Sequence, residues 1–236
     1  MRGIILAGGH GTRLKPLTNI TNKHLIAVYD KPMIEYPLKT LVDAGVKDIL
    51  IVSGREYAGD FLEYLGSGTD RELEFTYRVQ EKAGGIAEAL GLAEKFADGD
   101  DVLVILGDNY YEYAPSFDDL IGKGMAGIVL KKVSDPQRFG VANFKNNVLV
   151  ELEEKPKNPK SDLAITGLYF YPSDVFDIVK TLKPSRRGEL EITDVNNYYL
   201  INHRIVTTIY DGFWSDMGTP ESLGRTIEWI MNKKND

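Results

Sequence analysis

Short apolar runs rich in β-branched residues alternate with segments of helical periodicity through the first half of the chain. Runs of four to eight such residues are typical of buried strands, and apolar residues at i, i+3 and i+4 are typical of amphipathic helices. Strand–helix alternation of this kind predicts a mostly parallel sheet with helices on both faces. The pattern predicts strands over residues 3–7, 48–53, 73–78 and 102–106, and helices over 32–44, 57–65 and 86–96.

The second half of the chain is richer in strands. The same criteria predict strands over residues 127–132, 140–144, 148–153, 164–171 and 205–210, and helices over 176–182, 191–200 and 220–232. Residues 154–160 are rich in Pro and Lys, and we interpret them as a turn or lid because strands resume directly afterwards. Without an internal repeat or a low-complexity segment, the pattern predicts a single α/β domain over residues 1–236.

Pro32 and Gly45 mark the expected limits of the first helix. Proline fits the first turn of a helix, where the backbone N–H has no partner, and glycine commonly follows the last turn. We therefore expect Pro32 within the first turn and Gly45 as the stop signal.

Composition narrows the classes of function. The net charge is -7, which disfavours nonspecific binding to nucleic acid, and a triphosphate site would have to concentrate its cations locally. The absence of cysteine excludes disulfides, thiolate metal sites and cysteine nucleophiles. The apolar start is too short for a signal peptide and no stretch is long enough to span a membrane, so we expect a soluble cytoplasmic protein.

A glycine-rich loop follows the first predicted strand. Residues 8–13 read GGHGTR, and Leu14 stands where the dinucleotide fingerprint requires its last glycine. The G-K-[ST] ending of a Walker loop is also missing. Closely spaced glycines nevertheless let backbone N–H groups converge on an anion, and Arg13 and Lys23 would add positive charge. The alternative is a tight strand-to-helix turn with a surface arginine.

Two aspartates are candidates for a metal site. Asp108 follows the fully apolar strand predicted over residues 102–106, and ligands bind at the carboxyl ends of strands in open α/β sheets. Asp216 precedes the last predicted helix. Two carboxylates together with phosphate oxygens suit Mg²⁺. Taken alone, Asp216 is equally well explained as an ordinary turn residue.

Charged residues also gather where the strand over 148–153 ends and before the helix over 191–200. Glu154 and Lys155 could offer a hydroxyl acceptor and a phosphate donor from one edge of the sheet, and Arg187 belongs to a second charged segment. Taken alone, the segment with Glu154 and Lys155 is more often a solvated run of charges, and the segment with Arg187 could be only the charged start of a helix.

Nine short blocks, spread almost end to end, connect these features. They are residues 6–14 (LAGGHGTRL), 22–23 (NK), 30–34 (DKPMI), 106–109 (LGDN), 135–141 (DPQRFGV), 153–156 (EEKP), 166–169 (TGLY), 187–194 (RGELEITD) and 216–219 (DMGT). In this order the blocks resemble the glucose-1-phosphate thymidylyltransferases, a group of the sugar-phosphate nucleotidyltransferases.

The resemblance implies a Rossmann-like nucleotide-diphospho-sugar transferase fold, an α/β fold with a mixed, mostly parallel central sheet flanked by helices. It implies a Mg²⁺-dependent reaction in which dTTP and glucose 1-phosphate give dTDP-glucose and pyrophosphate, as in dTDP-rhamnose and polysaccharide biosynthesis. The N-terminal half would bind the nucleotide and the C-terminal half the sugar.

Site residues follow from the matching blocks. The resemblance assigns catalytic roles to Arg13, Lys23 and Lys155, and Mg²⁺ binding to Asp108 and Asp216. It assigns nucleotide binding to Leu6, Ala7, Gly8, Gly9, Gly11, Thr12, Arg13, Gln80, Gly85 and Asp108. It assigns sugar binding to Asn109, Gly140, Glu154, Lys155, Ile165 and Tyr169. Gln80 and the backbone at Gly85 would read the pyrimidine, and Arg187 is a further candidate for a phosphate contact.

The chain departs from the family pattern at three points. His24 stands where many relatives carry Gln, and Phe139 where many carry Tyr, which changes polar groups near the expected pocket. The sequence ends at Asp236, whereas longer relatives continue with helices that contribute to a regulatory nucleotide site. We therefore expect a short form without feedback inhibition by dTDP-rhamnose.

Other functions stay open at this stage. UTP could replace dTTP, which would make the protein a UTP-glucose-1-phosphate uridylyltransferase, or another sugar 1-phosphate could be the acceptor. A glycosyltransferase would require an Asp-x-Asp motif, but Asn109 and Tyr110 follow Asp108. A noncatalytic nucleotide-sensing subunit should lack the metal Asp or the loop cations. We expect no nucleic-acid or membrane partner, and a homo-oligomer, either a dimer or a tetramer.

Overall fold

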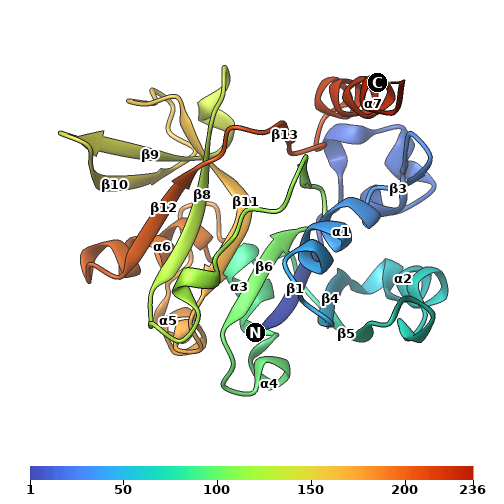
Figure 1. Ribbon diagram of the computed structural model, residues 1–236, viewed down its shortest axis with the longest axis horizontal. Coiled ribbons are helices and arrows are strands. Elements are labelled where there is room, and N and C mark those ends of the chain that lie inside the picture. Colours follow the sequence, from blue (N-terminus) through green and yellow to red (C-terminus); the bar gives the residue numbers. More distant parts are fainter. Residues whose placement is uncertain (236) are drawn as a thin grey trace. The chain divides into compact units, whose positions relative to one another are not determined.

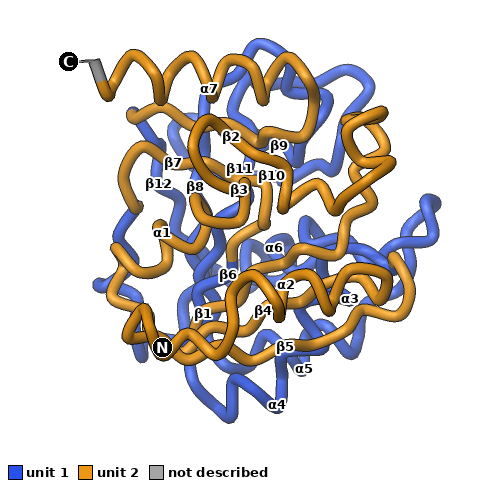
Figure 2. Tube along the Cα trace, turned by 90° about the vertical axis from the view of Figure 1, so that its right-hand side faces the viewer, with its two compact units in different colours: residues 1–2, 84–104, 115–211 blue, residues 3–83, 105–114, 212–236 orange. Residues whose placement is uncertain are grey.

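The protein is described here by a computed structural model that covers residues 1–235, so Asp236, the last residue of the predicted domain, lies outside the described residues. The chain forms two compact units, drawn in different colours in Figure 2. Unit 1 comprises residues 1–2, 84–104 and 115–211, and unit 2 comprises residues 3–83, 105–114 and 212–236. The chain enters both units more than once, and strand β6 (Val102–Leu106) contributes residues to each.

Unit 2 contains the first parallel strands of the chain. β1 (Arg2–Ala7) pairs in parallel with β4 (Asp48–Gly54), and β4 pairs in parallel with β5 (Glu74–Gln80). Gly3 lies opposite Ile49, and this register runs to the end of β1, where the glycine loop begins. The remaining α-helices and strands of unit 2 are β2 (Ala27–Val28), β3 (Lys31–Pro32), α1 (Glu35–Asp43), α2 (Ala58–Leu65), β7 (Tyr110–Tyr111), β13 (Trp214–Ser215) and α7 (Pro220–Asn235). Figure 2 labels β2 and β7, and Figure 1 labels the others.

Unit 1 carries the strand-rich part of the chain. β9 (Gly140–Lys145) and β10 (Val148–Glu154) form an antiparallel hairpin, and β11 (Leu163–Tyr171) pairs antiparallel with β9 and with β8 (Ala126–Lys132). β12 (Ile205–Ile209) adds to β8 in parallel. The helices of unit 1 are α3 (Ile86–Gly91), α4 (Glu94–Ala97), α5 (Val175–Thr181) and α6 (Ile192–Ile201). All but the first residue of β11 is buried, as expected of a strand covered on both faces.

Two helix predictions require correction. Pro32 lies in β3, where it pairs with Ala27, so the first helix begins at Glu35 and not at residue 32. Pro37 occupies the first turn instead, where a missing N–H costs nothing. The helix predicted over residues 86–96 is divided into α3 and α4, because the Ala93 N–H donates to the Leu90 carbonyl and tightens the turn after Gly91.

The C-terminal helix α7 anchors the segments that carry candidate site residues of unit 2. One buried cluster joins Leu14 and Met217 to Leu223 and Ile230 of α7, with Ile26, Val28, Met33 and Tyr36 completing it. Leu14 directly follows Arg13, and Met217 directly follows Asp216. The hydrophobic core therefore fixes the backbone beside both charged residues.

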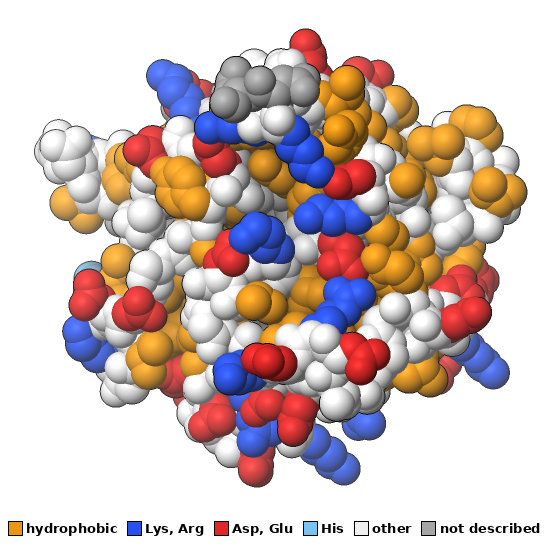
Figure 3. Space-filling model, turned by 45° about the vertical axis from the view of Figure 1, so that its right-hand side comes forward, with side chains coloured by type: hydrophobic (Ala, Val, Ile, Leu, Met, Phe, Trp, Pro, Cys, Tyr) orange, Lys and Arg blue, Asp and Glu red, His pale blue; other side chains and the backbone are white. Residues whose placement is uncertain are grey.

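The surface carries charges of both signs. On the face shown in Figure 3, Lys and Arg side chains alternate with Asp and Glu and do not gather into one basic patch. Among the described residues, 1–235, no helix is both long enough and apolar enough to cross a membrane.

Candidate active site

The glycine loop follows β1 in unit 2 and lies against polar side chains from distant segments. A Cβ at Gly8 would fall 2.2 Å from the Gln80 Oε1, and a Cβ at Gly9 would fall 3.3 Å from the Lys23 Nζ. Gly11 has a left-handed φ of 62°, and its carbonyl accepts a hydrogen bond of 3.0 Å from the Thr18 hydroxyl. Larger residues at these positions would displace Gln80 and Lys23, which explains the glycines.

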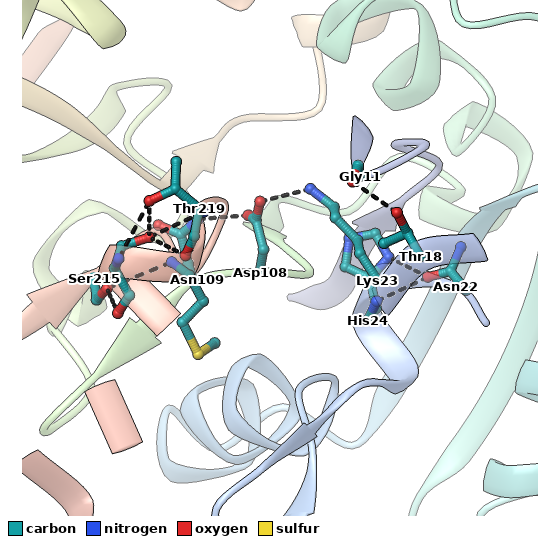
Figure 4. Close-up of polar contacts among 11 residues, drawn as sticks. Gly11, Thr18, Asn22, Lys23, His24, Asp108, Asn109, Ser215 and Thr219 are labelled. Carbon is teal, nitrogen blue, oxygen red and sulfur yellow. Dashed lines mark hydrogen bonds and ion pairs between the residues drawn. The ribbon is translucent and has the colours of Figure 1, made fainter. Parts of the chain in front are cut away.

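Lys23 points from the segment after the loop to Asp108 (Figure 4). Its Nζ lies 2.6 Å from the Asp108 Oδ2, and the two side chains are only 13% and 12% exposed. Asn22 precedes Lys23 and caps the short 3-10 turn Lys23–Leu25 by accepting a hydrogen bond from the His24 N–H. Two residues that the sequence placed in separate motifs thus form a buried ion pair.

The Asp108 carboxylate is held at both oxygens. Oδ2 accepts from Lys23, and Oδ1 accepts a hydrogen bond of 3.0 Å from the Asn109 Nδ2. The Asn109 Oδ1 in turn accepts a hydrogen bond of 2.8 Å from the Trp214 Nε1. Burial opposes ionisation of Asp108, but the Lys23 charge and these hydrogen bonds outweigh it, so the pKa of this carboxyl is below its ordinary value.

Arg13 and Asp216 flank the same glycine. A Cβ at Gly218 would lie 3.0 Å from the Arg13 Nη2 and 3.2 Å from the Asp216 Oδ2. The structure therefore places a predicted phosphate-binding cation and a predicted metal-binding carboxylate next to Gly218 in unit 2.

Gln80 and Gly85, the expected readers of the base, belong to different units. Gln80 is the last residue of β5 and is buried against Gly8. Gly85 directly precedes α3 and has a φ of 105°, and a Cβ there would lie 2.4 Å from the Leu190 carbonyl oxygen. The Leu190 N–H donates to the Gly84 carbonyl, and the Leu190 carbonyl accepts from the Ala87 N–H. The block over residues 187–194 thus braces the loop at Gly85.

The predicted sugar residues of unit 1 converge on Gly140, at the start of β9. Glu154 pairs with Gly140 across the hairpin. A Cβ at Gly140 would meet the Glu154 Oε2 at 3.5 Å, the Ile165 Cδ1 at 3.1 Å and the Thr193 Oγ1 at 3.0 Å. Tyr169, further along β11, is buried with its ring stacked on Tyr171.

Two cations share the Glu154 carboxylate. The Arg187 Nη1 and the Lys155 Nζ lie 3.5 Å and 3.4 Å from the Glu154 Oε1. Arg187 also pairs with Glu189 and Glu191. The Lys155 backbone has a φ of 42°, and its N–H donates to the Phe139 carbonyl.

Sequence reasoning gave no role to Thr193 or Trp214. The Thr193 hydroxyl donates to the Glu154 Oε2 at 2.6 Å, and Trp214 orients Asn109. Thr193 lies within one of the nine blocks, so the sequence could have marked it as a candidate. Nothing in the neighbouring residues indicated which carboxylate its hydroxyl would contact.

The donor set fits a magnesium ion. Within residues 1–235 there is no group of three or more His, Cys, Asp or Glu side chains that could hold a metal by themselves. Mg²⁺ is usually held by one or two carboxylates, with substrate phosphates and waters completing its shell. The ionised, buried Asp108 supplies an anionic oxygen ligand of this kind, and Asp216 beside Arg13 is a second.

Comparison with known proteins identifies the family. A model of the nucleotidyl transferase family matches residues 2–232, and this chain belongs to that family. It is 44% identical to the glucose-1-phosphate thymidylyltransferase of Neisseria meningitidis, covering 100% of this chain and 84% of the relative. It is 41% identical to the enzyme of that name from Mycobacterium tuberculosis, covering 98% and 82%.

Solved structures agree with the fold. A crystal structure from Bacillus anthracis, provisionally assigned as a glucose-1-phosphate thymidylyltransferase and in complex with a sucrose, matches with a TM-score of 0.90 at 48% identity over 97% of this chain and 94% of that one. A UDP-glucose pyrophosphorylase complexed with UDP-glucose matches with a TM-score of 0.84 at 24% identity over 98% of each chain, which shows the fold alone. The predicted Rossmann-like α/β fold class and the nucleotidyltransferase class are therefore confirmed.

Proposed function

We propose that the protein is a glucose-1-phosphate thymidylyltransferase, which converts dTTP and α-D-glucose 1-phosphate into dTDP-glucose and pyrophosphate. The observation that carries this proposal is the buried Lys23–Asp108 pair beside the glycine loop. The names of three relatives, 44%, 43% and 41% identical to this chain, support the same reaction.

Unit 2 supplies the groups for the triphosphate. Backbone N–H groups of the loop over residues 8–13 would bind phosphate oxygens, and Arg13 and Lys23 would neutralise the charge that builds on the leaving pyrophosphate. Leu6, Ala7, Gln80 and, from unit 1, Gly85 would complete the nucleotide contacts. Asp108 and Asp216 would hold Mg²⁺, which supplies positive charge to the phosphate oxygens when bound.

Unit 1 supplies the groups for the sugar phosphate. Glu154 would accept a sugar hydroxyl, held for this by Thr193, while Gly140, Ile165 and Tyr169 would shape the pocket. Lys155 would bind the phosphate, with Arg187 as a second cation. Asn109 contacts Asp108 and Trp214. In addition to the expected sugar contact, we therefore assign it the role of orienting the Asp108 carboxylate.

The chemistry is one in-line displacement. An oxygen of the sugar phosphate attacks the α-phosphorus, its new P–O bond forms as the bond to pyrophosphate breaks, and no covalent enzyme intermediate is required. The attacking oxygen is already anionic at neutral pH, so no strong general base is needed. The protein must bring two repelling anions together and stabilise the charge on the leaving group, which is the task of positioned cations.

The choice of base rests on modest differences. Gln80 and a backbone amide can read thymine and uracil alike, and a methyl group or a hydroxyl changes selectivity by roughly 10- to 200-fold. UTP is therefore the alternative nucleotide. Because the substrates are metabolites of the cytoplasm, we propose a cytoplasmic location, and we keep the homo-oligomer, the single functional domain and the absence of nucleic-acid partners as expectations.

A pyrophosphate-release assay across nucleoside triphosphates and sugar 1-phosphates, with Mg²⁺, tests the proposal. We expect the highest kcat/KM for dTTP with glucose 1-phosphate and dTDP-glucose as the product in mass spectrometry. Asp108→Asn should lose the activity, whereas Asp119→Asn, at an exposed position, should keep it. A higher kcat/KM for UTP would assign the alternative, and no release with any pair would contradict the proposal.

A further inference from the structure

His24 is a buried histidine that the proposed reaction does not use. It is 1% exposed and directly follows Lys23 in the chain. Its ring Nδ1 lies 2.7 Å from the Asn22 Oδ1 (Figure 4). Its carbonyl accepts a hydrogen bond of 2.8 Å from the Ile34 N–H. The ring and the backbone carbonyl of His24 are therefore both held by hydrogen bonds.

The contact with Asn22 determines the tautomer. The Asn22 Oδ1 also accepts the His24 backbone N–H at 2.9 Å, which identifies this atom as the amide oxygen. An amide oxygen can only accept, so the ring Nδ1 must carry the proton and donate. Burial, and then the charge of Lys23, lower the pKa of His24, which keeps the ring neutral and leaves Nε2 without a proton.

The other edge of the ring packs on the turn that carries Asp108. A Cβ at Gly107 would lie 2.8 Å from the His24 Cδ2 and 3.2 Å from its Nε2, so the imidazole fills the space that a side chain at residue 107 would need. Lys23 and Asp108 are the chain neighbours of His24 and Gly107. The ring thus sets the spacing between the two backbone segments that present the ion pair.

We propose that His24 is a positioning residue for nucleotidyl transfer. Its ring, protonated at Nδ1 and clamped between Asn22 and Gly107, holds Lys23 in line with Asp108 before the triphosphate binds. This inference rests on the proposed function, because it assigns Lys23 to the triphosphate. The residue that stands where many relatives carry Gln is thus assigned a structural task beside the site, through its buried ring.

Nitrogen NMR of ¹⁵N-histidine-labelled protein tests the tautomer without any substrate. The chain has three histidines, so variants of His10 and His203 assign the signals. We expect His24 to show a protonated Nδ1 and an unprotonated Nε2. A proton on Nε2 would overturn the proposal whatever the enzyme does with dTTP, whereas a wild-type protein that releases no pyrophosphate would contradict the proposed function and leave this result standing.

A double-mutant cycle tests the action through Lys23. His24→Leu should lower kcat by up to about 10²-fold, the scale of a catalytic group displaced by about 1 Å, with a smaller change in KM for dTTP. In a Lys23→Ala background the same substitution should change kcat less than about twofold, because the group it positions is gone. An equal loss in both backgrounds would show a merely structural role and overturn the proposal.

Two further variants serve as controls for this test. His203→Asn changes an exposed histidine and should leave kcat unchanged. His24→Asn keeps an N–H donor one bond from Cγ, as in the Nδ1–H tautomer, and should recover most of the kcat that His24→Leu loses. If His24→Leu does not fold, His24→Asn and the wild-type NMR still decide, and a kcat of His24→Asn reduced as far as expected for leucine would contradict the role of the donor.

Discussion

The two units hold their charged residues in different ways. In unit 2 the Lys23 Nζ lies 2.6 Å from the Asp108 Oδ2, and both side chains are almost fully buried. In unit 1 the Lys155 Nζ and the Arg187 Nη1 lie 3.4 Å and 3.5 Å from one oxygen of Glu154, and these two cations are 44% and 43% exposed. The Lys23–Asp108 pair is short and buried, whereas in unit 1 two half-exposed cations share one carboxylate oxygen at longer distances.

This difference separates two uses of charge. Breaking a buried pair leaves an uncompensated charge in a region of low dielectric, so Lys23 is preorganised and costly to remove. Exposed pairs contribute little to stability because water screens them, so Lys155 and Arg187 can leave Glu154 for an incoming phosphate at small cost. We infer that the nucleotide side of the reaction depends on preset charges and the sugar side on adaptable ones.

The largest expected effect comes from removing a cation of unit 2. Lys23→Ala or Arg13→Ala should lower turnover by roughly 10²–10³, the scale of one lost preorganised donor. Lys23→Ala should also lower the free energy of unfolding by about 3–5 kcal/mol, because Asp108 stays buried without its partner. Denaturant titrations and pyrophosphate release measure the two effects.

Lys39→Ala is the matched control for the buried pair, because Lys39 pairs with Asp43 on the surface. It should change the free energy of unfolding by less than about 1 kcal/mol and leave turnover unchanged. Near-normal turnover in both Lys23→Ala and Arg13→Ala would refute their assignment.

In unit 1, Glu154→Gln should separate binding from stability. Loss of a charged acceptor should raise KM for glucose 1-phosphate about 10- to 100-fold, since such hydrogen bonds contribute about 1.5–3 kcal/mol. The free energy of unfolding should change by less than about 1 kcal/mol. Glu153→Gln is the control, because its side chain points to the opposite face of β10. A loss of stability as large as that of Lys23→Ala would remove the contrast between the units.

Gly85→Ala should act on the nucleotide through the backbone alone. Alanine at a φ of 105° is strained, and its Cβ would fall 2.4 Å from the Leu190 carbonyl oxygen, so we expect a cost of about 1–3 kcal/mol in unfolding free energy and a higher KM for dTTP. Gly99→Ala, also at a positive φ but with no atom near its Cβ, isolates the strain from the clash. Equal costs for the two substitutions would show that Leu190 does not brace this loop.

The smallest expected effect is on the pH dependence of stability. Burial and Lys23 lower the pKa of His24 from 6.5, so below pH 6.5 the unfolded chain binds a proton that the folded chain refuses. The contribution of His24 to the free energy of unfolding is then fully present above pH 6.5. It decreases as the pH drops toward the pKa of the folded state, by at most about 1.4 kcal/mol per pH unit. Denaturant titrations of the metal-free protein should give a flatter profile for His24→Leu; an unchanged profile would contradict the prediction.

Local patterns predicted most of the fold and many of the candidate residues. The strands over 3–7, 48–53 and 102–106 lie within β1, β4 and β6, because apolar β-branched runs have few other stable arrangements. Boundaries were less accurate at Pro32, which belongs to the short strand β3, and after Gly91, where the Ala93 N–H bonds to the Leu90 carbonyl and tightens the turn. Positions of the matched blocks could be read from the sequence, but their partners could not.

The sequence by itself determined which residues are candidates for the chemistry: a glycine loop with a following arginine, an aspartate after an apolar strand, and a glutamate and lysine after another. Only the tertiary structure decided that Lys23 meets Asp108, 85 positions away, that Trp214 orients Asn109, 105 positions away, and that His24 is buried behind the pair. The physical reason is that periodicity and turn chemistry act over a few residues. The environment and charge state of a side chain depend instead on segments that folding brings together from distant parts of the chain.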